Sequence, residues 1–341
     1  GTGQLFWNTT GTTFNLGAGS LIDVQGGTFV GSSNSNEVWT NNLSSLNIAS
    51  GAIFGGSEGN IRVDALTGAG ALTTGYNALG SITVGVNGTA AGVYNTTAGT
   101  AIFSGIISSS TINTGVTSLS KVGTGTQILT GGNSYQGATS ISAGTLQVGN
   151  GGSTGILGTG SVVNNSSLVF NRGNTLTVTN AISGSGSLSQ AGAGTTVLTA
   201  NNSYTGTTSI NAGTLQIGNA GTTGTLGTGA VSIDTGSNLN FYRSNSLGTN
   251  NAISGTGNIN FLGTGTQGQS DYSLGGNNSG FSGNINLTSS RLGIAAANRL
   301  GTAALTVNSG AGLFLNGNFT VNNTLSLAGN GWNETPWGYL G

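Results

Sequence analysis

The sequence predicts an all-β protein, wound as a parallel β-solenoid with about three rungs in each 69-residue repeat. Three observations predict this class: a long internal repeat, short segments in which apolar and small polar residues alternate, and very frequent glycine. Alternation of period two, closed by Gly or Asn, is typical of strands. Gly recurs every few residues and weakens a helix interior by about 1 kcal/mol relative to Ala, so we expect essentially no helix.

The long repeat occurs twice with nearly the same sequence. "GTGTQILTGGNSYQGATSISAGTLQVGN" occupies 123–150, and "GAGTTVLTANNSYTGTTSINAGTLQIGN" occupies 192–219. The two align without a gap, so that Tyr135 corresponds to Tyr204. A fixed period of this kind indicates an array whose units bury their apolar sides against their neighbours.

A degraded third copy follows. Residues 257–267 correspond to 186–196, and residues 277–287 correspond to 201–210 with one residue inserted. We therefore expect one continuous solenoid with segments of unequal regularity. These are irregular rungs at 1–117, two well-formed repeats at 118–262, and a degenerate repeat at 263–341 that is truncated at its C-terminus.

A shorter period near the N-terminus gives the size of a rung. "IDVQGGTFVG" at 22–31 matches "LNIASGAIFG" at 46–55, at a spacing of 24 residues. We expect rungs of about 20–25 residues, stacked in parallel at roughly 4.8 Å. Three such rungs fit into one 69-residue repeat.

Within a rung, the apolar positions predict the core. We expect Ile128, Ile141, Leu146 and Val148 to point inward and to form rows with their equivalents in adjacent rungs. Gly and Asn would make the corners, since both tolerate turn conformations. Asn residues at these corners are also expected to stack amide on amide from rung to rung.

Composition excludes several classes of protein. The 341 residues include 66 Gly, one Pro, and no Cys, Met or His, with a net charge of −1 from six basic and seven acidic side chains. No basic face exists to neutralise phosphates, so we expect neither nucleic acid nor an anionic membrane surface as a partner. No long uninterrupted apolar run occurs, so we expect no direct insertion into a membrane. Without Cys there is no disulfide or thiolate metal site. We predict no cofactor and no metal.

The blocks "NSYQGATSISAGTLQVG" at 133–149 and "NSYTGTTSINAGTLQIG" at 202–218 carry a family resemblance. They resemble the autotransporter-associated β-strand repeat of passenger segments in large bacterial surface proteins. The resemblance implies a right-handed parallel β-helix, displayed on or released from the surface of a Gram-negative cell. Members of this family often act as adhesins or structural spacers.

Two sets of recurring residues are candidate ligand contacts, and for both the sequence favours packing. Arg172 and Arg243 occupy equivalent places and would bind an anion or a glycan, or bond to nearby carbonyls at a corner. Tyr135, Tyr204 and Phe281 recur once per unit and would stack on sugar rings, or pack into the solenoid.

The tryptophans lie outside the well-formed repeats. They are Trp7, Trp39, Trp332 and Trp337. Capping of the ends or packing against another domain is the favoured interpretation, and a contact with a ligand or a second subunit is the alternative.

The acidic residues are scattered and supply no clustered carboxylates, so we predict no catalytic residue and no enzyme. The favoured function is an extracellular structural or adhesive rod. One alternative is a subunit of a homopolymeric filament or sheath, which would associate head to tail. Another is a glycan-binding or lyase β-helix. Expected partners are other surface proteins, glycans or copies of the same chain.

Overall fold

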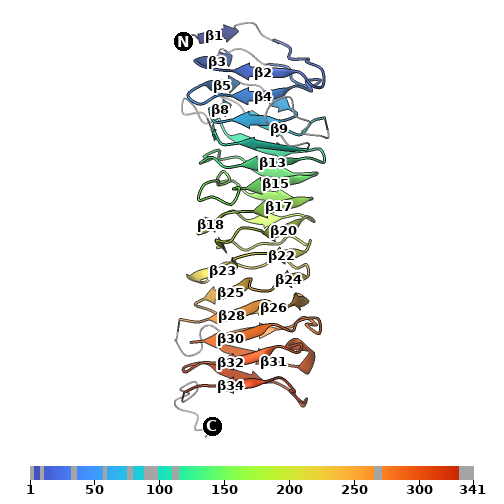
Figure 1. The fold of residues 1–341 in the computed structure, drawn as a ribbon, viewed down its shortest axis with the longest axis vertical. Helices are drawn as coiled ribbons and strands as arrows, with labels where there is room; N and C mark the ends of the chain where they lie inside the picture. The colour runs from blue at the N-terminus through green and yellow to red at the C-terminus, as the bar shows by residue number, and fades with distance from the viewer. Residues whose placement is uncertain are drawn as a thin grey trace. The chain divides into compact units, whose positions relative to one another are not determined.

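The computed structural model describes residues 4–7, 11–31, 37–56, 60–74, 80–87, 99–109, 115–264 and 271–329. The chain divides into two compact units, Gly1–Arg172 and Gly173–Gly341. Figure 1 shows the strands of each unit stacked one after another. The boundaries expected at 117/118 and 262/263, and the continuity of one solenoid, stay predictions.

The first unit contains strands of three parallel sheets. One sheet holds β1 (Gln4–Trp7), β3 (Thr28–Gly31), β5 (Ile53–Gly56), β8 (Ala71–Thr74) and β11 (Ile106–Ser109). The second holds β2 (Leu21–Val24), β4 (Ser45–Ile48), β7 (Leu66–Gly68), β10 (Thr100–Phe103), β13 (Thr126–Leu129), β15 (Thr145–Val148) and β17 (Ser167–Phe170). The third holds β6 (Asn60–Val63), β9 (Gly80–Val84), β12 (Thr117–Lys121), β14 (Thr139–Ile141) and β16 (Val162–Asn164).

The second unit is built in the same way. Its β20 sheet holds β20 (Ser187–Gln190), β22 (Thr208–Ile210), β24 (Val231–Ile233) and β27 (Ile253–Gly255). Its β28 sheet holds β18 (Leu176–Val178), β21 (Thr195–Leu198), β23 (Thr214–Gly221), β25 (Asn238–Arg243), β28 (Asn258–Leu262), β30 (Asn284–Thr288), β32 (Ala304–Val307) and β34 (Leu325–Leu327). Its β29 sheet holds β26 (Leu247–Thr249), β29 (Asp271–Leu274), β31 (Arg291–Ile294) and β33 (Gly312–Leu315). The short strand β19 spans Ile182–Ser183.

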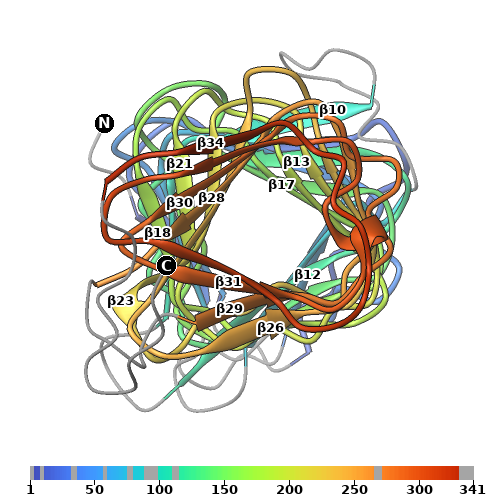
Figure 2. The ribbon, with the colours of Figure 1, turned by 90° about the horizontal axis from the view of Figure 1, so that it is seen from below.

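Successive strands along the chain pass from sheet to sheet, and each coil of the chain pairs in parallel with the next. The match found at a spacing of 24 residues is such a pairing, because Ile22 of β2 lies beside Leu46 of β4. Figure 2 shows two sides of the second unit, with β28 and β30 on one and β26, β29 and β31 on another. The predicted all-β parallel solenoid is confirmed, and its right-handed winding stays a prediction of the resemblance.

Helix is almost absent from the described parts of the chain. They contain one single-turn 3-10 helix, η1, at Ala297–Arg299. No helix found there has the length and apolar character needed to cross a bilayer.

In the second unit the repeat does not return to the sheet where it began. From β20, three coils lead through β22 and β24 to β27 within one sheet. The third copy of the β20 sequence is β28, which follows β27 directly and belongs to a different sheet. One repeat therefore takes the chain through three complete coils and then on to the next sheet of the solenoid. The prediction of about three rungs per repeat is confirmed, and the further step to the next sheet moves equivalent residues onto different sheets.

Rows of apolar side chains fill the interior of each coil. In the β28 sheet, Leu215, Leu239, Ile259, Ile285 and Leu305 follow one another in register. Each is at most 1% exposed. Burying a side chain of this size contributes about 1.5–3 kcal/mol. The parallel register thus brings like side chains together from coil to coil.

The four residues expected in the core are buried, but Ile128 does not share the row of its neighbour Leu146. Ile141, Leu146 and Val148 are fully buried, but the register places Gln127, and not Ile128, beside Leu146. The Gln127 amide is satisfied because its Nε2 donates to the carbonyl of Leu66 at 2.9 Å. Ile128 is buried as expected, at 6% exposed, but it lies in the row of Gln147 and not in that of Leu146. Adjacent apolar residues hide the phase of a period-two pattern.

Buried asparagines that lie outside strands join their coil to the two neighbouring coils. Oδ1 of Asn202 accepts from the backbone N–H of Ile182 at 2.9 Å, and its Nδ2 donates to the carbonyl of Thr225 at 2.7 Å. One partner lies in the preceding coil and the other in the following coil. Asn133 and Asn278 hold equivalent places and make the same two kinds of bond in their own coils. We call these three residues the asparagine clamps.

A second group of asparagines forms ladders between adjacent strands. Asn258 Nδ2 donates to Asn238 Oδ1 at 3.0 Å, and Asn284 Nδ2 donates to Asn258 Oδ1 at 2.9 Å. Asn260 bonds to its neighbours on β25 and β30 in the same way, at 2.8 Å on each side. The amide contacts expected from the sequence thus exist, both outside strands, where Asn298 Nδ2 donates to Asn277 Oδ1 at 3.2 Å, and as ladders on the outer face of β25, β28 and β30. Parallel register brings identical residues side by side on strands.

Replacing a clamp should destabilise the fold. In Asn202→Ala, the buried N–H of Ile182 and the carbonyl of Thr225 lose their partner, and each unsatisfied buried group costs about 1–3 kcal/mol. We expect the free energy of unfolding in urea to fall by about 2 kcal/mol or more. The exposed Asn322→Ala is the control and should change it by less than about 0.5 kcal/mol. Equal effects of the two substitutions would contradict the role given to the clamps.

Candidate functional site

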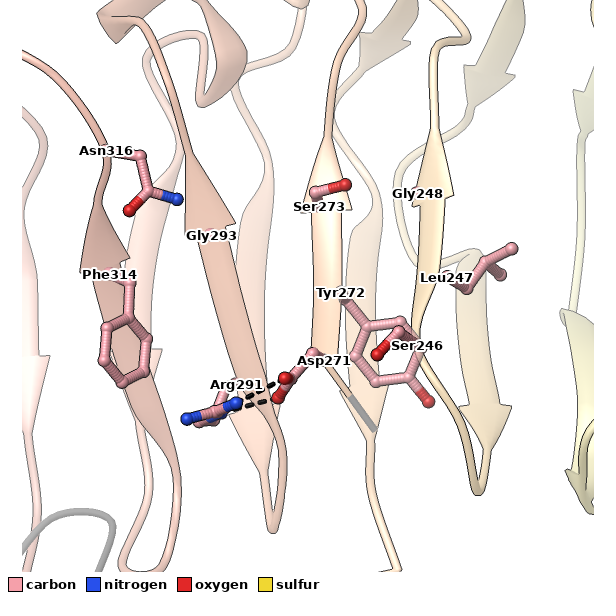
Figure 3. Close-up of a pocket in the computed structure, with 10 residues that line it drawn as sticks. All are labelled: Ser246, Leu247, Gly248, Asp271, Tyr272, Ser273, Arg291, Gly293, Phe314 and Asn316. Carbon is pink, nitrogen blue, oxygen red and sulfur yellow. Dashed lines mark hydrogen bonds and ion pairs between the residues drawn. The ribbon is translucent and has the colours of Figure 1, made fainter. Parts of the chain in front are cut away.

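A groove lies on the outer face of the β29 sheet in the second unit (Figure 3). Its volume is about 380 Å³. The residues that line it come from the four strands of that sheet and the turns beside them. They are Ser246, Leu247, Gly248, Asp271, Tyr272, Ser273, Arg291, Gly293, Phe314 and Asn316.

The floor of the groove is hollow because the outward-facing residues that lie side by side there have small side chains or none. Gly248 lies beside Ser273, Ser273 beside Gly293, and Gly293 beside Phe314. Outward-facing positions on a strand normally carry side chains that cover the sheet. Here two of the four carry none and a third carries only a hydroxymethyl group. The Phe314 ring stands at the end of this row as a wall.

An ion pair forms the second wall. The guanidinium of Arg291 binds Asp271 in a two-pronged fashion, with Nε donating to Oδ1 at 2.5 Å and the terminal Nη2 donating to Oδ2. Arg291 also stands over the Phe314 ring, with Cζ at 5.1 Å from the ring centroid. Both charged side chains remain partly exposed, Arg291 at 22% and Asp271 at 33%. The wall is therefore polar on its open side and has no net charge.

Tyr272 supports the groove from beneath. Its side chain is buried, and its hydroxyl donates to the carbonyl of Leu262 at 2.8 Å while accepting from the N–H of Arg243 at 2.9 Å. Burial raises the pKa of Tyr272 above its usual value. The hydroxyl is committed to the backbone of neighbouring strands. Tyr272 thus fixes the shape of the groove and supplies no free proton donor.

A smaller hollow of about 200 Å³ adjoins the groove and shares Leu247 and Gly248 with it. Asn250 and Thr228 are among its other lining residues. Hydroxyl and amide groups therefore continue past one end of the groove.

The two recurring arginines do not line the groove, and their side chains bind backbone. Arg172 is 8% exposed and donates through Nη1 to the carbonyl of Gly155 at 2.8 Å, and Arg243 is 6% exposed and donates to the carbonyl of Gly224 at 2.8 Å. Nη2 donates to Ser153 in one case and to Thr222 in the other. Burial lowers the pKa of both guanidinium groups. These are packing contacts at corners.

The recurring aromatic residues are in the interior. Tyr135 and Tyr204 are fully buried, and their hydroxyls share hydrogen bonds of 2.8 Å with Thr139 and Thr208. Phe281 is 1% exposed. Tyr204 precedes β22 whereas Phe281 precedes β30, so the two approach different sheets. They form no aromatic row on one face.

The tryptophans fall into three groups. Trp39 is buried and stacks on Phe14 with ring centroids 4.0 Å apart. The backbone of Trp7 lies in β1, but its side chain is outside the described part of the structure. Trp332 and Trp337 lie outside the described residues altogether.

Lys121 is the one buried amine, and its surroundings indicate a structural role. Its Nζ donates to the carbonyls of Val122, Gly123 and Ala143 at 2.5, 2.8 and 3.2 Å. Burial lowers its pKa to about 8, against a smaller opposing effect of Asp64. The equivalent residue in the next repeat is Gln190, whose Nε2 donates to the carbonyl of Gly192 at 2.7 Å. A neutral amide thus serves the same purpose.

Nothing at the groove provides a set of catalytic or metal-binding groups. Asp271 is its only carboxylate, and the described residues contain no group of three or more His, Asp or Glu side chains placed to hold a metal ion. The arrangement is suited to binding a neutral, hydroxyl-rich molecule through hydrogen bonds and one aromatic face.

Sequence reasoning did not find this groove. A signal was present, because Asp271 and Arg291 are 20 residues apart, which is the length of one coil. Opposite charges at that spacing are expected to meet on adjacent strands. The residues that recur with the 69-residue repeat, such as Arg172 and Tyr135, are instead side chains that pack within the coils.

Comparison with known proteins identifies the repeats. The family model described as "Passenger-associated-transport-repeat" matches residues 119–148 and 188–217. The protein named "Adhesin BmaC autotransporter", from Brucella suis biovar 1 (strain 1330), is 52% identical over 56 residues. That alignment covers 16% of this chain and 2% of the relative. No solved structure matches the chain significantly.

The resemblance to autotransporter passenger repeats is therefore confirmed. The two matched segments begin and end inside the well-formed copies of the repeat. The first covers β12 to β15, and the second covers β20 to β23. The chain thus carries passenger-type repeats, each folded as parallel coils within its own unit.

The buried lysine gives a pH-dependent prediction. The folded pKa of about 8 lies below the unfolded value of 10.5, so between these values the unfolded chain holds a proton that the folded chain releases. The free energy of unfolding should therefore rise by about 1–2 kcal/mol from pH 8 to pH 10. In Lys121→Gln, which copies Gln190, this rise should vanish. Urea unfolding at pH 8, 9 and 10 measures it, and equal pH dependence of both proteins would contradict it.

Proposed function

We propose that the chain forms part of an extracellular adhesive rod, carried as passenger sequence at the surface of a Gram-negative bacterium. The match to passenger-associated repeats supports a passenger. The relative that is named an adhesin supports an adhesive role, although the alignment covers only 2% of that protein. The chain's own contribution would be a stiff support with binding sites on its sides.

The observation that carries the proposal is the way in which coils are joined. Within each unit, consecutive coils are linked by backbone hydrogen bonds in parallel register, by apolar rows and by asparagine clamps. The outer faces carry mostly uncharged side chains, such as the ladders formed around Asn258 and Asn260. A charge repeated in each coil would face its own copy at about 4.8 Å, whereas amides in that position bond to one another. Further coils with such a surface can be stacked without charge repulsion between neighbouring coils.

A non-enzymatic role follows from the same groups. Three of the ionisable side chains buried in the coils, Lys121, Arg172 and Arg243, are bonded to backbone. The groove on the β29 sheet holds one carboxylate and one guanidinium, and these bind each other. General acid and base catalysis needs groups that are free to exchange protons with a substrate. We therefore propose binding and support, with no catalytic step.

Antibodies raised against the purified chain test this proposal on cells that make the complete protein. We expect labelling of intact cells, loss of the label after brief protease treatment, and weaker attachment of cells to surfaces when the protein is deleted. Labelling only after permeabilisation would contradict the surface location. Unchanged attachment of the deletion strain, despite labelling of the parent strain, would contradict the adhesive role.

A further inference from the structure

We propose that the groove on the β29 sheet binds a neutral saccharide, with a pyranose ring seated on the glycine floor beside Phe314. This inference rests on the proposed adhesive function and gives that function a ligand class. Its support comes from the floor, the two walls and the continuation of the groove.

The floor is open for a reason other than backbone geometry. Neither Gly248 nor Gly293 has the positive φ angle that requires glycine. A Cβ on Gly248 would meet only the Ser273 hydroxyl oxygen, at 2.8 Å, and one on Gly293 would meet the side-chain nitrogen of Asn316 at 3.2 Å. Both neighbours are ends of side chains that can move aside. Glycine on an extended strand often marks a place where a ligand approaches the backbone closely.

The walls suit the two sides of a sugar. The Phe314 ring is partly exposed and offers apolar surface for the C–H groups of a pyranose, beside the Arg291 guanidinium that lies over the ring at 5.1 Å from its centroid. Asp271 accepts hydrogen bonds and Arg291 donates them, so their partly exposed edges match neighbouring hydroxyl groups. Asn316 and Ser273 add an amide and a hydroxyl at the same groove.

The charge of the site favours a neutral ligand. Arg291 is held by both oxygens of Asp271, so an anionic sugar would meet a carboxylate and would have to displace it. The whole chain carries a net charge of only −1 and supplies no positive field to attract an anion. Hydroxyl groups, in contrast, bond to the pair without breaking it.

The dimensions favour more than one sugar unit. The groove of about 380 Å³ lies in the lower part of the range of small-molecule sites, roughly 300–1,000 Å³. The adjoining hollow of about 200 Å³ continues it across Leu247 and Gly248 toward Asn250. A linear oligosaccharide would run from Phe314 across the strands of the sheet, toward β26.

Calorimetry on the full chain tests the inference with defined probes. The probes are neutral oligosaccharides built from glucose, mannose, galactose and N-acetylhexosamines, alongside sialylated and sulfated counterparts. We expect at least one neutral oligosaccharide to bind, with a dissociation constant below about 1 mM. Phe314→Ala should weaken binding about tenfold or more, and Gly293→Val should do the same by filling the floor.

Matched controls separate the groove from general effects on folding. Leu315→Ala alters the neighbouring exposed residue, and Gly221→Val adds the same side chain where a Cβ would meet nothing within 4 Å. Both controls should bind like the wild type, and all four variants should keep the wild-type circular dichroism spectrum. If Gly293→Val does not keep it, Phe314→Ala decides the question, because truncating a partly exposed ring leaves the backbone intact.

Three results would overturn the inference. They are the absence of binding by every neutral probe up to about 10 mM, unchanged binding in Phe314→Ala, and binding of charged probes alone. None of these depends on where the protein resides. Antibody labelling of intact cells together with no saccharide binding would remove the groove ligand and leave the proposed surface role in place.

Discussion

The hydrogen bonds between consecutive coils are the interaction on which the rest of the structure depends. A single coil of about 20 residues cannot satisfy its own backbone groups or cover its own apolar side chains. Parallel pairing solves both problems at once, because it joins the backbones and aligns like residues in rows, as at Leu239, Ile259 and Ile285. Where the chain leaves strand geometry, the asparagine clamps add side-chain bonds between coils, as Asn202 does to Ile182 and Thr225.

The length of the sequence repeat is not a whole number of coils, and this determines where a surface site is formed. In the second unit a repeat equals three coils plus one side, so equivalent residues such as Ser209 and Asn286 lie on different sheets, in β22 and β30. A site repeated with the sequence would wind around the coils and never form a continuous face. The groove arises instead from residues of adjacent coils, such as Asp271 and Arg291, which sequence similarity does not relate.

Much of the fold was predictable from the sequence because stacking leaves a periodic trace. The alternation of apolar residues predicted the strands, and the spacing between 22–31 and 46–55 predicted a real pairing of β2 with β4. The phase of an individual strand was harder to predict. Ile128 is buried as expected, but Gln127 lies in the row of Leu146, where its amide reaches a backbone carbonyl. The groove was not predicted, because its floor is formed where Gly248 and Gly293 leave the sheet uncovered. In a chain with 66 glycines, nothing in the sequence distinguishes these two from the others.

Hydrogen exchange of backbone amides tests most directly the claim that neighbouring coils hold one another. The decisive amides are those of Ile182 and Ile253, which donate to the side chains of Asn202 and Asn278. The account predicts that they exchange as slowly as the N–H groups of Leu188 and Val231, which bond to backbone carbonyls of the following coil. Exchange of Ile182 and Ile253 at the rate of exposed turns would contradict it, since the asparagine clamps would then not hold neighbouring coils together.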